Sequence, residues 1–421
     1  MFFMFNFLSM QVLEVDKNNA VLDIKDISFP KKENTPLVDV PVDGKGETIG
    51  YAISLTGCGD ESLTDGGAVL KHSIHLSSSA NKSSKSKYGY KMYAIVHPDA
   101  VKCSTQLEQI GYEILVRDVP VPVADIQGEY LRTKVVNNGC CGEKEFIKLW
   151  AYTLTQHRAV VHLDLDTVVL QPLDDLFDAM LMETSASLEV RRNIPVMFEK
   201  DMPDVVDAFF TRDYNMNQPR TKKPVLVQGG FLVLRPSMDS FETYKNIIRE
   251  GDFRQGSGWG GKGYVTYGAM TFQGIVPYFY DVMRPNTSTE VSRCVYNAQA
   301  DNPRTGKTID NKVQGDCRDG QSDCRDCREA DVSTVKLAHF TLCQKPWNCL
   351  PHNDHDLRHK LCRKLHHEWF RIRKNLENQW YSDSKRESMK EQRNGKFQPE
   401  QFFGYCKSSG AKGYLPIKVP N

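Results

Sequence analysis

In the first half of the chain, short apolar runs alternate with segments whose apolar residues recur at helical spacing. Strands are predicted at residues 50–56, 88–97, 112–116 and 160–170. Helices are predicted between them at residues 67–74, 106–111 and 146–154, followed by a helical turn at 173–177. Because this alternation is typical of βαβ units, the pattern predicts an α/β protein with a doubly wound, Rossmann-like, mostly parallel sheet flanked by helices.

The second half of the chain is less regular. Residues 225–236 read as a strand that Gly229 and Gly230 interrupt, which indicates a close approach of backbone or ligand. A last strand is predicted at 334–339, and apolar residues four apart predict an amphipathic helix over 357–381. The glycine-rich residues 256–263 are either a flexible lid or a phosphate contact.

These patterns suggest three regions. Residues 1–46 form a polar lead or stalk, residues 47–381 a single catalytic domain with a cysteine-bearing insertion at 285–331, and residues 382–421 a tail. The first 15 residues are a poor signal peptide and suit a truncated anchor, a short strand or a disordered lead. Membrane tethering through a weak or missing anchor therefore stays open, although no stretch is long and apolar enough to span a bilayer.

Composition and charge narrow the class of partner. The chain has 421 residues, of which 40% are hydrophobic and 25% charged, as expected for a globular enzyme. A formal net charge of +1 gives no overall field that would attract nucleic acid, so no nucleic-acid partner is expected.

Cysteines and sequons bear on the compartment. There are twelve cysteines, seven of them from Cys294 to Cys362, and N-x-S/T sequons at Asn81 and Asn286. Together they favour disulfides and a secretory lumen, most simply the Golgi, over free thiols in the cytoplasm. The spacing of Cys317, Cys324 and Cys327 would also suit half a zinc knuckle, and disulfides are the favoured alternative.

An acidic pair lies within the apolar run at 160–170. Alternation along a strand places Asp164 and Asp166 on one face, where two carboxylates repel each other unless a cation lies between them. A divalent metal is the obvious candidate, and the alternative is a helix cap with a solvated strand end.

A second polar stretch begins at His339, where the last strand ends. Neutral histidine is a good ligand for Mn²⁺, and Lys345, followed by Pro346 and Trp347, is suited to phosphate oxygens. Alone, His339 would more often be a core residue. Beside an acidic pair that lacks a third ligand, it is predicted to bind the metal.

Four motifs in order resemble the glycogenin-like enzymes of glycosyltransferase family eight, over about residues 48–350. These are residues 146–149, the pair Asp164 and Asp166, the Gly229–Gly230 strand with 235–237, and His339 with 345–347. The resemblance implies a GT-A fold and metal-dependent, retaining transfer of a hexosyl group from a UDP-sugar. The acceptor would be a glycan, a glycoprotein or a small molecule.

The resemblance also implies roles for individual residues. Asp164, Asp166 and His339 would hold Mn²⁺ or Mg²⁺, Lys345 would contact the donor diphosphate, and Lys148 would face the donor sugar or phosphate. The metal and Lys345 would then neutralise the charge that builds on the leaving diphosphate.

Further donor contacts are implied elsewhere in the chain. Thr56 falls where the family contacts the nucleobase, and Gln228, Gly229 and Gly230 replace the family's Asn-Ala-Gly.

Two more positions match the family loosely. Gln273 faces the reactive carbon of the sugar in the family's pattern, but Phe272 stands where a carboxylate is usual. Asp213 matches a sugar-binding aspartate.

Two other functions remain open. The acidic pair also looks like the nucleophile loop of haloacid-dehalogenase-type phosphatases, with Asp164 as nucleophile and Asp166 as acid–base. Phe272 and Gln228 would suit a catalytically weak sugar-nucleotide-binding scaffold. The acceptor is expected to bind at residues 251–331, because acceptor pockets are built from variable loops.

Overall fold

The computed structural model describes residues 46–58, 63–198, 202–216, 224–263, 265–310, 312–353, 355–380 and 394–419. The N-terminal lead and its weak anchor lie outside the described residues, apart from Gly46. Among the helices of the described part, none combines the length and apolarity that crossing a membrane requires.

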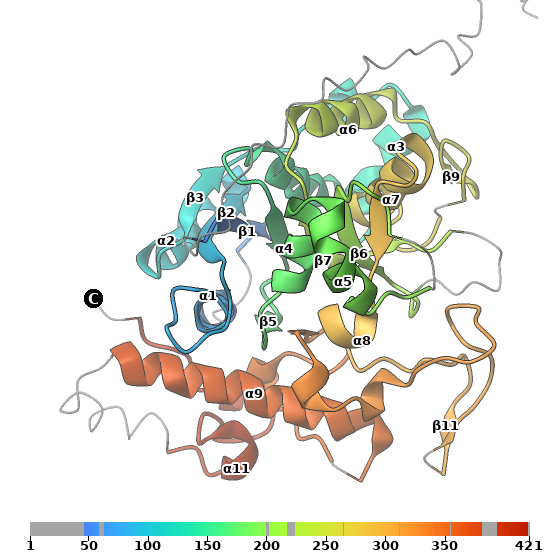
Figure 1. Cartoon of the computed structure of the whole chain (residues 1–421). Coiled ribbons are helices and arrows are strands. Elements are labelled where there is room, and N and C mark those ends of the chain that lie inside the picture. The colour runs from blue at the N-terminus through green and yellow to red at the C-terminus, as the bar shows by residue number, and fades with distance from the viewer. Residues whose placement is uncertain are drawn as a thin grey trace, which may run out of the picture. The chain divides into compact units, whose positions relative to one another are not determined.

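A seven-stranded sheet forms the centre of the described residues (Figure 1), with the order β10-β6-β7-β4-β1-β2-β3. β1 is parallel to β2 and β4, β2 to β3, and β10 to β6, whereas β7 is antiparallel to both of its neighbours. The sheet confirms the predicted α/β class with a Rossmann-like, mostly parallel arrangement. Its strands are β1 (Thr48–Leu55), β2 (Gly89–Val96), β3 (Glu113–Val116), β4 (Val160–Leu163), β6 (Ala208–Arg212), β7 (Val227–Leu234) and β10 (Ser288–Glu290).

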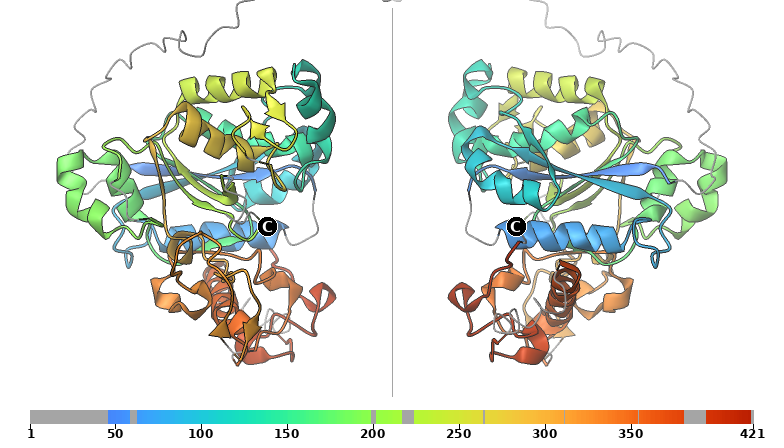
Figure 2. Two further views of the ribbon diagram at one scale, coloured as in Figure 1. Left: turned by 90° about the vertical axis from the view of Figure 1, so that its right-hand side faces the viewer. Right: turned by 90° about the vertical axis from the view of Figure 1, so that its left-hand side faces the viewer.

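Helices cover both faces of this sheet, as the edge-on views of Figure 2 show. One face carries α1 (Leu63–Leu76) and α4 (Asp174–Leu181), and α9 (Leu357–Trp380) packs on the outer side of α1. The other face carries η5 (Gly142–Thr153), α6 (Met238–Glu250) and α7 (Phe272–Tyr278). The other α-helices within the described residues are α2 (Val101–Gln109), α3 (Glu129–Lys134), α5 (Thr184–Asn193), α8 (Arg293–Tyr296) and α11 (Pro399–Phe402).

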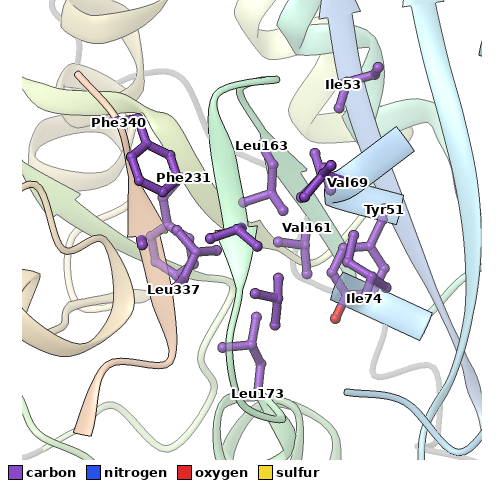
Figure 3. Packing of buried hydrophobic residues seen from close by; sticks show 14 of the residues in the cluster. Tyr51, Ile53, Val69, Ile74, Val161, Leu163, Leu173, Phe231, Leu337 and Phe340 are labelled. Atoms are coloured by element: carbon purple, nitrogen blue, oxygen red, sulfur yellow. The ribbon is translucent and has the colours of Figure 1, made fainter. Parts of the chain in front are cut away.

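Alternation along the strands divides the interior into two apolar cores. On β1, Tyr51 and Ile53 belong to the core under α1 and α9, whereas Ala52 belongs to the core under α6 and α7. This follows from the period of two in a strand, which sends successive side chains to opposite faces. In Figure 3 the first core continues from β4 and β7 to Leu337 and Phe340, so the segment that carries His339 is packed on the sheet.

The prediction of one continuous strand over 160–170 is wrong. β4 ends at Leu163, and a separate strand β5 (Thr167–Val169) pairs antiparallel with β13 (Leu337–His339) outside the main sheet. The residues between them form a turn, in which the backbone N–H and hydroxyl of Thr167 both donate to the Asp164 carbonyl, at 3.2 and 2.7 Å. The turn, and not β-alternation, therefore sets the relation of Asp164 to Asp166.

Other boundaries also differ from the predictions. The helix expected at 146–154 is the 3₁₀ helix η5, and the one expected at 106–111 is α2, which begins earlier, at Val101. Strand β6 was not predicted, and β10, α8 and the hairpin of β11 (Thr308–Ile309) and β12 (Lys312–Val313) come from the predicted insertion. The glycine-rich residues 256–263 include β9 (Gly258–Trp259), which forms a hairpin with the preceding β8 (Phe253–Arg254).

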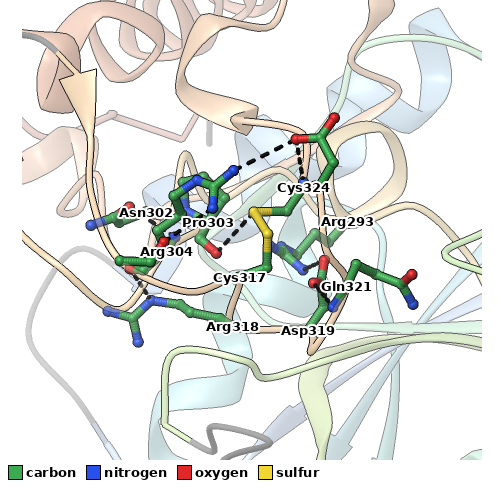
Figure 4. Close-up of a disulfide and its surroundings, with 11 residues drawn as sticks. Arg293, Asn302, Pro303, Arg304, Cys317, Arg318, Asp319, Gln321 and Cys324 are labelled. Atoms are coloured by element: carbon green, nitrogen blue, oxygen red, sulfur yellow. Dashed lines mark hydrogen bonds and ion pairs between the residues drawn. A yellow bond between two sulfur atoms is a disulfide. The ribbon is translucent and has the colours of Figure 1, made fainter.

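Disulfides join ten of the twelve cysteines, which confirms the disulfide prediction. Cys317 and Cys324 are bonded to each other (Figure 4) and Cys327 is bonded to Cys294, so the zinc-knuckle alternative is wrong. The remaining pairs are Cys58–Cys103, Cys343–Cys362 and Cys349–Cys406. Cys140 and Cys141 are free.

Candidate active site

The candidate site lies at one edge of the central sheet. Asp164 follows the carboxyl end of β4, and Gly229 and Gly230 lie near the amino end of the antiparallel neighbour β7, so both meet at the same edge. The Asp164 N–H donates to the Gly230 carbonyl at 3.2 Å. In open α/β sheets, ligands bind outside the carboxyl ends of the strands.

The structure brings Asp164, Asp166 and His339 together. Each offers a ligand atom, and these atoms all lie within 4.8 Å of one another. His339 Nε2 is 3.3 Å from Asp166 Oδ1, and the ammonium of Lys345 contacts the other oxygen of Asp166. Lys148 lies 2.9 Å from Asp164. Two ammonium groups therefore offset the repulsion between the carboxylates.

The imidazole of His339 is held in one orientation. Its Nδ1 lies 3.1 Å from Asn297 Oδ1, an acceptor, which places the ring proton on Nδ1. The Nε2 lone pair then accepts from the Thr341 hydroxyl at 2.8 Å, with Asp166 Oδ1 at 3.3 Å. Burial lowers the pKa of His339 to about 4 despite the opposing charge of Asp164, so the ring is neutral at physiological pH. Neutral imidazole is the form that binds metals.

Gln228 and Asn297 support His339 from behind. Asn297 donates to Gln228 Oε1 at 3.2 Å and to the Thr211 hydroxyl at 2.8 Å. Gln228 Oε1 also accepts from the Gly230 N–H at 2.7 Å. Gln228 therefore supports the site indirectly, because it fixes the Asn297 side chain that contacts His339. Asn297, which the sequence did not single out, lies 42 residues from His339, so no local motif joins them.

Lys148 is a buried cation from η5. Its Nζ donates to Asp164 Oδ1 at 2.9 Å and to the Gly229 carbonyl at 3.3 Å, and it lies 3.3 Å from Glu145. Burial alone would lower the pKa of Lys148, but Asp164 and Glu145 outweigh burial and raise it. Burial likewise opposes the charged form of Asp164, yet Lys148 and His339 hold the pKa of Asp164 below its usual value.

Two glycines make room for these side chains. A Cβ on Gly230 would lie 2.9 Å from both His339 Nδ1 and Asp164 Oδ2, whereas a Cβ on Gly229 would point to Gln273 Cγ at 3.2 Å. The register of β6 against β7 shifts beside this stretch. Such bulges re-aim residues near active sites. The close approach predicted at Gly229 and Gly230 is therefore an approach of the site's own side chains.

The weaker family matches occupy different places. Gln273 donates from Nε2 to the Val227 carbonyl at 3.2 Å, next to Gly229. Phe272 is buried, with Lys148 Nζ 5.6 Å from the centre of its ring, so an aromatic face replaces the usual carboxylate.

Asp213 lies outside the three-residue cluster. Its Oδ1 accepts from the backbone N–H groups of Asn215 and Met216 at 3.1 and 3.0 Å, and burial raises its pKa. Asp213 shares a small pocket with Asn297 and Gln299, on the side of His339 that faces away from Asp166.

A pair of adjacent thiols near Thr56 was not predicted. Thr56 follows β1 and hydrogen-bonds to Cys141, and the Cys140 thiol donates to Glu145 Oε1 at 2.8 Å. The close contact with Cys140 lowers the pKa of Cys141 against the opposing effect of burial. The two adjacent cysteines just before the motif at residues 146–149 were the sequence feature that could have revealed this pair.

No protein-family model matches the chain, and no curated protein matches it in sequence. Among solved structures, it is similar to the bifunctional glycosyltransferase WbbM, at 15% identity and a TM-score of 0.38 over 73% of this chain and 48% of WbbM. This chain therefore spans about half of WbbM.

Two further solved structures have similar scores. Mouse xyloside xylosyltransferase 1 has 10% identity and a TM-score of 0.37, over 70% of this chain and 98% of that protein. The galactosyltransferase LgtC, solved with donor and acceptor sugar analogs, has 11% identity and a TM-score of 0.35, over 71% and 89%. At such scores these likenesses carry no argument about function, which rests on the side chains of this chain.

Proposed function

We propose that this chain is a metal-dependent, retaining glycosyltransferase that moves a hexosyl group from a UDP-sugar to a glycan, glycoprotein or small-molecule acceptor. The observation that carries the proposal is the convergence of Asp164, Asp166 and His339 between two lysines at the sheet edge. The motif order that resembles family eight gives the reaction class and the retaining outcome.

The cluster suits Mn²⁺ or Mg²⁺ as its cation. Two carboxylates and a neutral imidazole match the preference of Mn²⁺ for oxygen and nitrogen ligands. His339 is oriented by Asn297, as metal-binding histidines usually are by a hydrogen-bond partner. When bound, the cation would act as a Lewis acid toward the donor diphosphate.

The two lysines have different tasks. The side chain of Lys345 is 37% exposed and contacts Asp166, so its ammonium can turn to a diphosphate that enters from solvent. The side chain of Lys148 is only 9% exposed, and its bonds to Asp164 and the Gly229 carbonyl hold that carboxylate in place. We therefore assign diphosphate binding to Lys345, and orientation of Asp164 beside the donor to Lys148.

The donor sugar is assigned to the β7 side of the site. Gln273 lies against Gly229 there, with its amide fixed by the Val227 carbonyl, and so presents a polar group beside Lys148. Phe272 packs under Lys148 and supplies no carboxylate. Position 272 therefore has no carboxylate that could act as the nucleophile for a covalent intermediate.

A large cavity with many polar side chains in its lining is our candidate acceptor site. It has a volume of about 1100 Å³ and reaches Leu342, which lies between His339 and Lys345 along the chain. Three disulfides fix its walls, because Arg318 and Arg328 line it next to bonded cysteines and Cys362 is itself bonded. Figure 4 shows the Cys317–Cys324 disulfide beside Arg318. Amide, carboxylate and guanidinium groups share the lining with apolar atoms, and these polar groups suit the hydroxyl groups of a glycan.

The two alternative functions differ in what they require. A haloacid-dehalogenase-type phosphatase needs a second acidic pair beside Asp164, and the third group in this cluster is the imidazole of His339, which favours the transferase. A non-catalytic scaffold would keep the same cluster without turnover.

The decisive experiment is a panel of UDP-sugars assayed for Mn²⁺-dependent hydrolysis and transfer. Asp166→Asn should lower turnover by orders of magnitude, because it removes a metal ligand. Asp118→Asn, at a side chain that is 75% exposed, is the matched control and should keep the parent rate. Equal rates in Asp166→Asn and the parent would contradict the metal assignment.

Two other results would redirect the proposal. Binding of UDP without hydrolysis or transfer of any donor would favour the scaffold. Hydrolysis of an aryl phosphate that His339→Ala leaves unchanged would favour the phosphatase.

We also propose a secretory-lumen location, with the Golgi as the expected compartment. The disulfides support this, because they persist in oxidising compartments. Peptide mapping without reduction, on protein isolated from its own cells, should recover the five bonded pairs. Recovery of these ten cysteines as free thiols would instead support the cytoplasm.

A further inference from the structure

Two adjacent thiols and a carboxylate form a second cluster beside the candidate site. Cys140 is exposed, Cys141 is half-buried and Glu145 is buried. The two sulfur atoms are 2.7 Å apart, and Cys140 Sγ is 2.8 Å from Glu145 Oε1. These are the two free cysteines of a chain that otherwise pairs its cysteines in disulfides.

The backbone around the pair is constrained. Gly139 and Gly142 flank the two cysteines with φ of +67° and +61°, in the left-handed region that favours glycine. A Cβ on Gly142 would lie 2.5 Å from the Val136 carbonyl oxygen, so this turn is closely packed. The loop thus presents both thiols next to the first turn of η5, which carries Glu145.

The carboxylate of Glu145 has one oxygen for each neighbour. Oε1 accepts from Cys140, whereas Oε2 lies 3.3 Å from Lys148. Glu145 can therefore offer Oε1 to a ligand and keep its ion pair with Lys148.

We propose that Cys140, Cys141 and Glu145 bind a soft divalent cation of the Zn²⁺ class, with water as the fourth ligand on the exposed side of Cys140. The ligand atoms of the three residues lie within 4.8 Å of one another. This site is separate from the cluster of Asp164, Asp166 and His339, and nothing in the proposed transfer reaction requires it.

The two sulfur atoms need to move only a short distance to bind the cation. Tetrahedral Zn²⁺ with Zn–S bonds of about 2.3 Å holds two sulfurs roughly 3.8 Å apart. The sulfurs of Cys140 and Cys141 must therefore separate by about 1 Å, which rotation about their Cα–Cβ bonds supplies. On binding, the two thiols each lose a proton to solvent, and two Zn–S bonds form with no change of oxidation state.

The two clusters should select different metals. Thiolates favour Zn²⁺, Co²⁺ and Cd²⁺, whereas the carboxylates and imidazole of the other cluster suit Mn²⁺. Glu145, Lys148 and Asp164 nevertheless connect them through consecutive ion pairs of 3.3 and 2.9 Å. A cation on the thiols would thus lie close to the proposed donor-binding groups.

Co²⁺ titration of the full chain, monitored by absorbance, tests the proposal, because thiolate ligation gives a near-ultraviolet charge-transfer band that carboxylate and imidazole ligation lacks. We expect one equivalent of Co²⁺ to produce this band and Zn²⁺ to abolish it. Cys141→Ser and Cys140→Ser should lose the band, and Glu145→Gln should weaken Co²⁺ binding by at least about 10-fold. Asp166→Asn should retain it.

Two controls distinguish loss of metal binding from loss of the fold or of the free thiols. Circular dichroism should show that the serine variants are folded, and alkylation without denaturant should label both thiols. Three results would overturn the proposal: absence of the band at one equivalent, a band that survives in Cys141→Ser, or a disulfide between Cys140 and Cys141 in the isolated protein.

Discussion

Replacement of Gly230 by alanine should disable the candidate metal site while leaving all three of its ligands in the chain. The added Cβ would lie 2.9 Å from His339 Nδ1 and from Asp164 Oδ2, and closer still to His339 Cε1. Non-bonded heavy atoms prefer about 3.5 Å or more, so the ring must retreat by more than about 0.5 Å. Metal–ligand distances tolerate only about 0.2 Å.

The expected loss of Mn²⁺ affinity can be estimated from metal sites whose neighbouring residues have been changed. Changes next to the ligands typically lower metal affinity by about 10–100-fold, or roughly 1.4–2.7 kcal/mol. Overpacking of the buried strand should also lower the free energy of unfolding by about 1–3 kcal/mol. Mn²⁺ affinity of Gly230→Ala, measured by electron paramagnetic resonance on the folded variant, gives the first quantity, and denaturant unfolding gives the second.

The neighbouring glycine provides the matched control. A Cβ on Gly229 would meet Gln273 Cγ at 3.2 Å and Lys148 Nζ at 3.6 Å, atoms of flexible side chains that are not predicted ligands. Gly229→Ala should therefore bind Mn²⁺ within a few-fold of the parent. Equal Mn²⁺ affinity in the parent and Gly230→Ala would refute the assignment of His339 and Asp164 as joint ligands.

Two further predictions concern stability. Arg373→Met should lower the free energy of unfolding by about 3–5 kcal/mol, because it leaves the buried Asp65 and Glu377 without their cation. Arg371→Met, at an exposed ion pair, should cost no more than about 1 kcal/mol in the same urea titration, and equal losses would contradict this account. Burial lowers the pKa of His366 to about 3 in the folded protein, against about 6.5 in the unfolded chain. Between these two pH values the unfolded chain binds more protons, so the free energy of unfolding falls by about 1.4 kcal/mol for each pH unit of acidification. His366→Phe should flatten this acid-side slope in unfolding measured from pH 6.5 to pH 4.5, and parallel curves for variant and parent would count against it.

Strands of the sheet were predicted well from the sequence where both of their faces are apolar. β1, β2 and β7 could be predicted because burial on two sides leaves a largely apolar run. β10 lies at the edge of the sheet and consists of polar residues, so its sequence carries no such signal. Helical spacing likewise cannot separate an α-helix from the 3₁₀ helix η5, since both bring residues three to four apart to one face.

The residues of the candidate site were predictable by type, but their arrangement was not. Asp164, Asp166 and His339 stand out because charged or titratable groups interrupt apolar runs. Their convergence depends on the turn after β4 and on pairing between β5 and β13, which are distant in sequence. Asn297 was missed for the same reason, since its contact with His339 exists only in the folded chain.

The pairing of β5 with β13 also dictates when the site can form during synthesis. Thr167 is opposite His339 in this ladder, so about 170 residues must follow the acidic turn before its imidazole exists. At translation rates of about 5–20 residues per second, this interval lasts roughly 10–35 seconds. Throughout this interval, a nascent chain exposes Asp164 and Asp166 without His339, so the proposed metal cluster can assemble only after most of the described residues have been made.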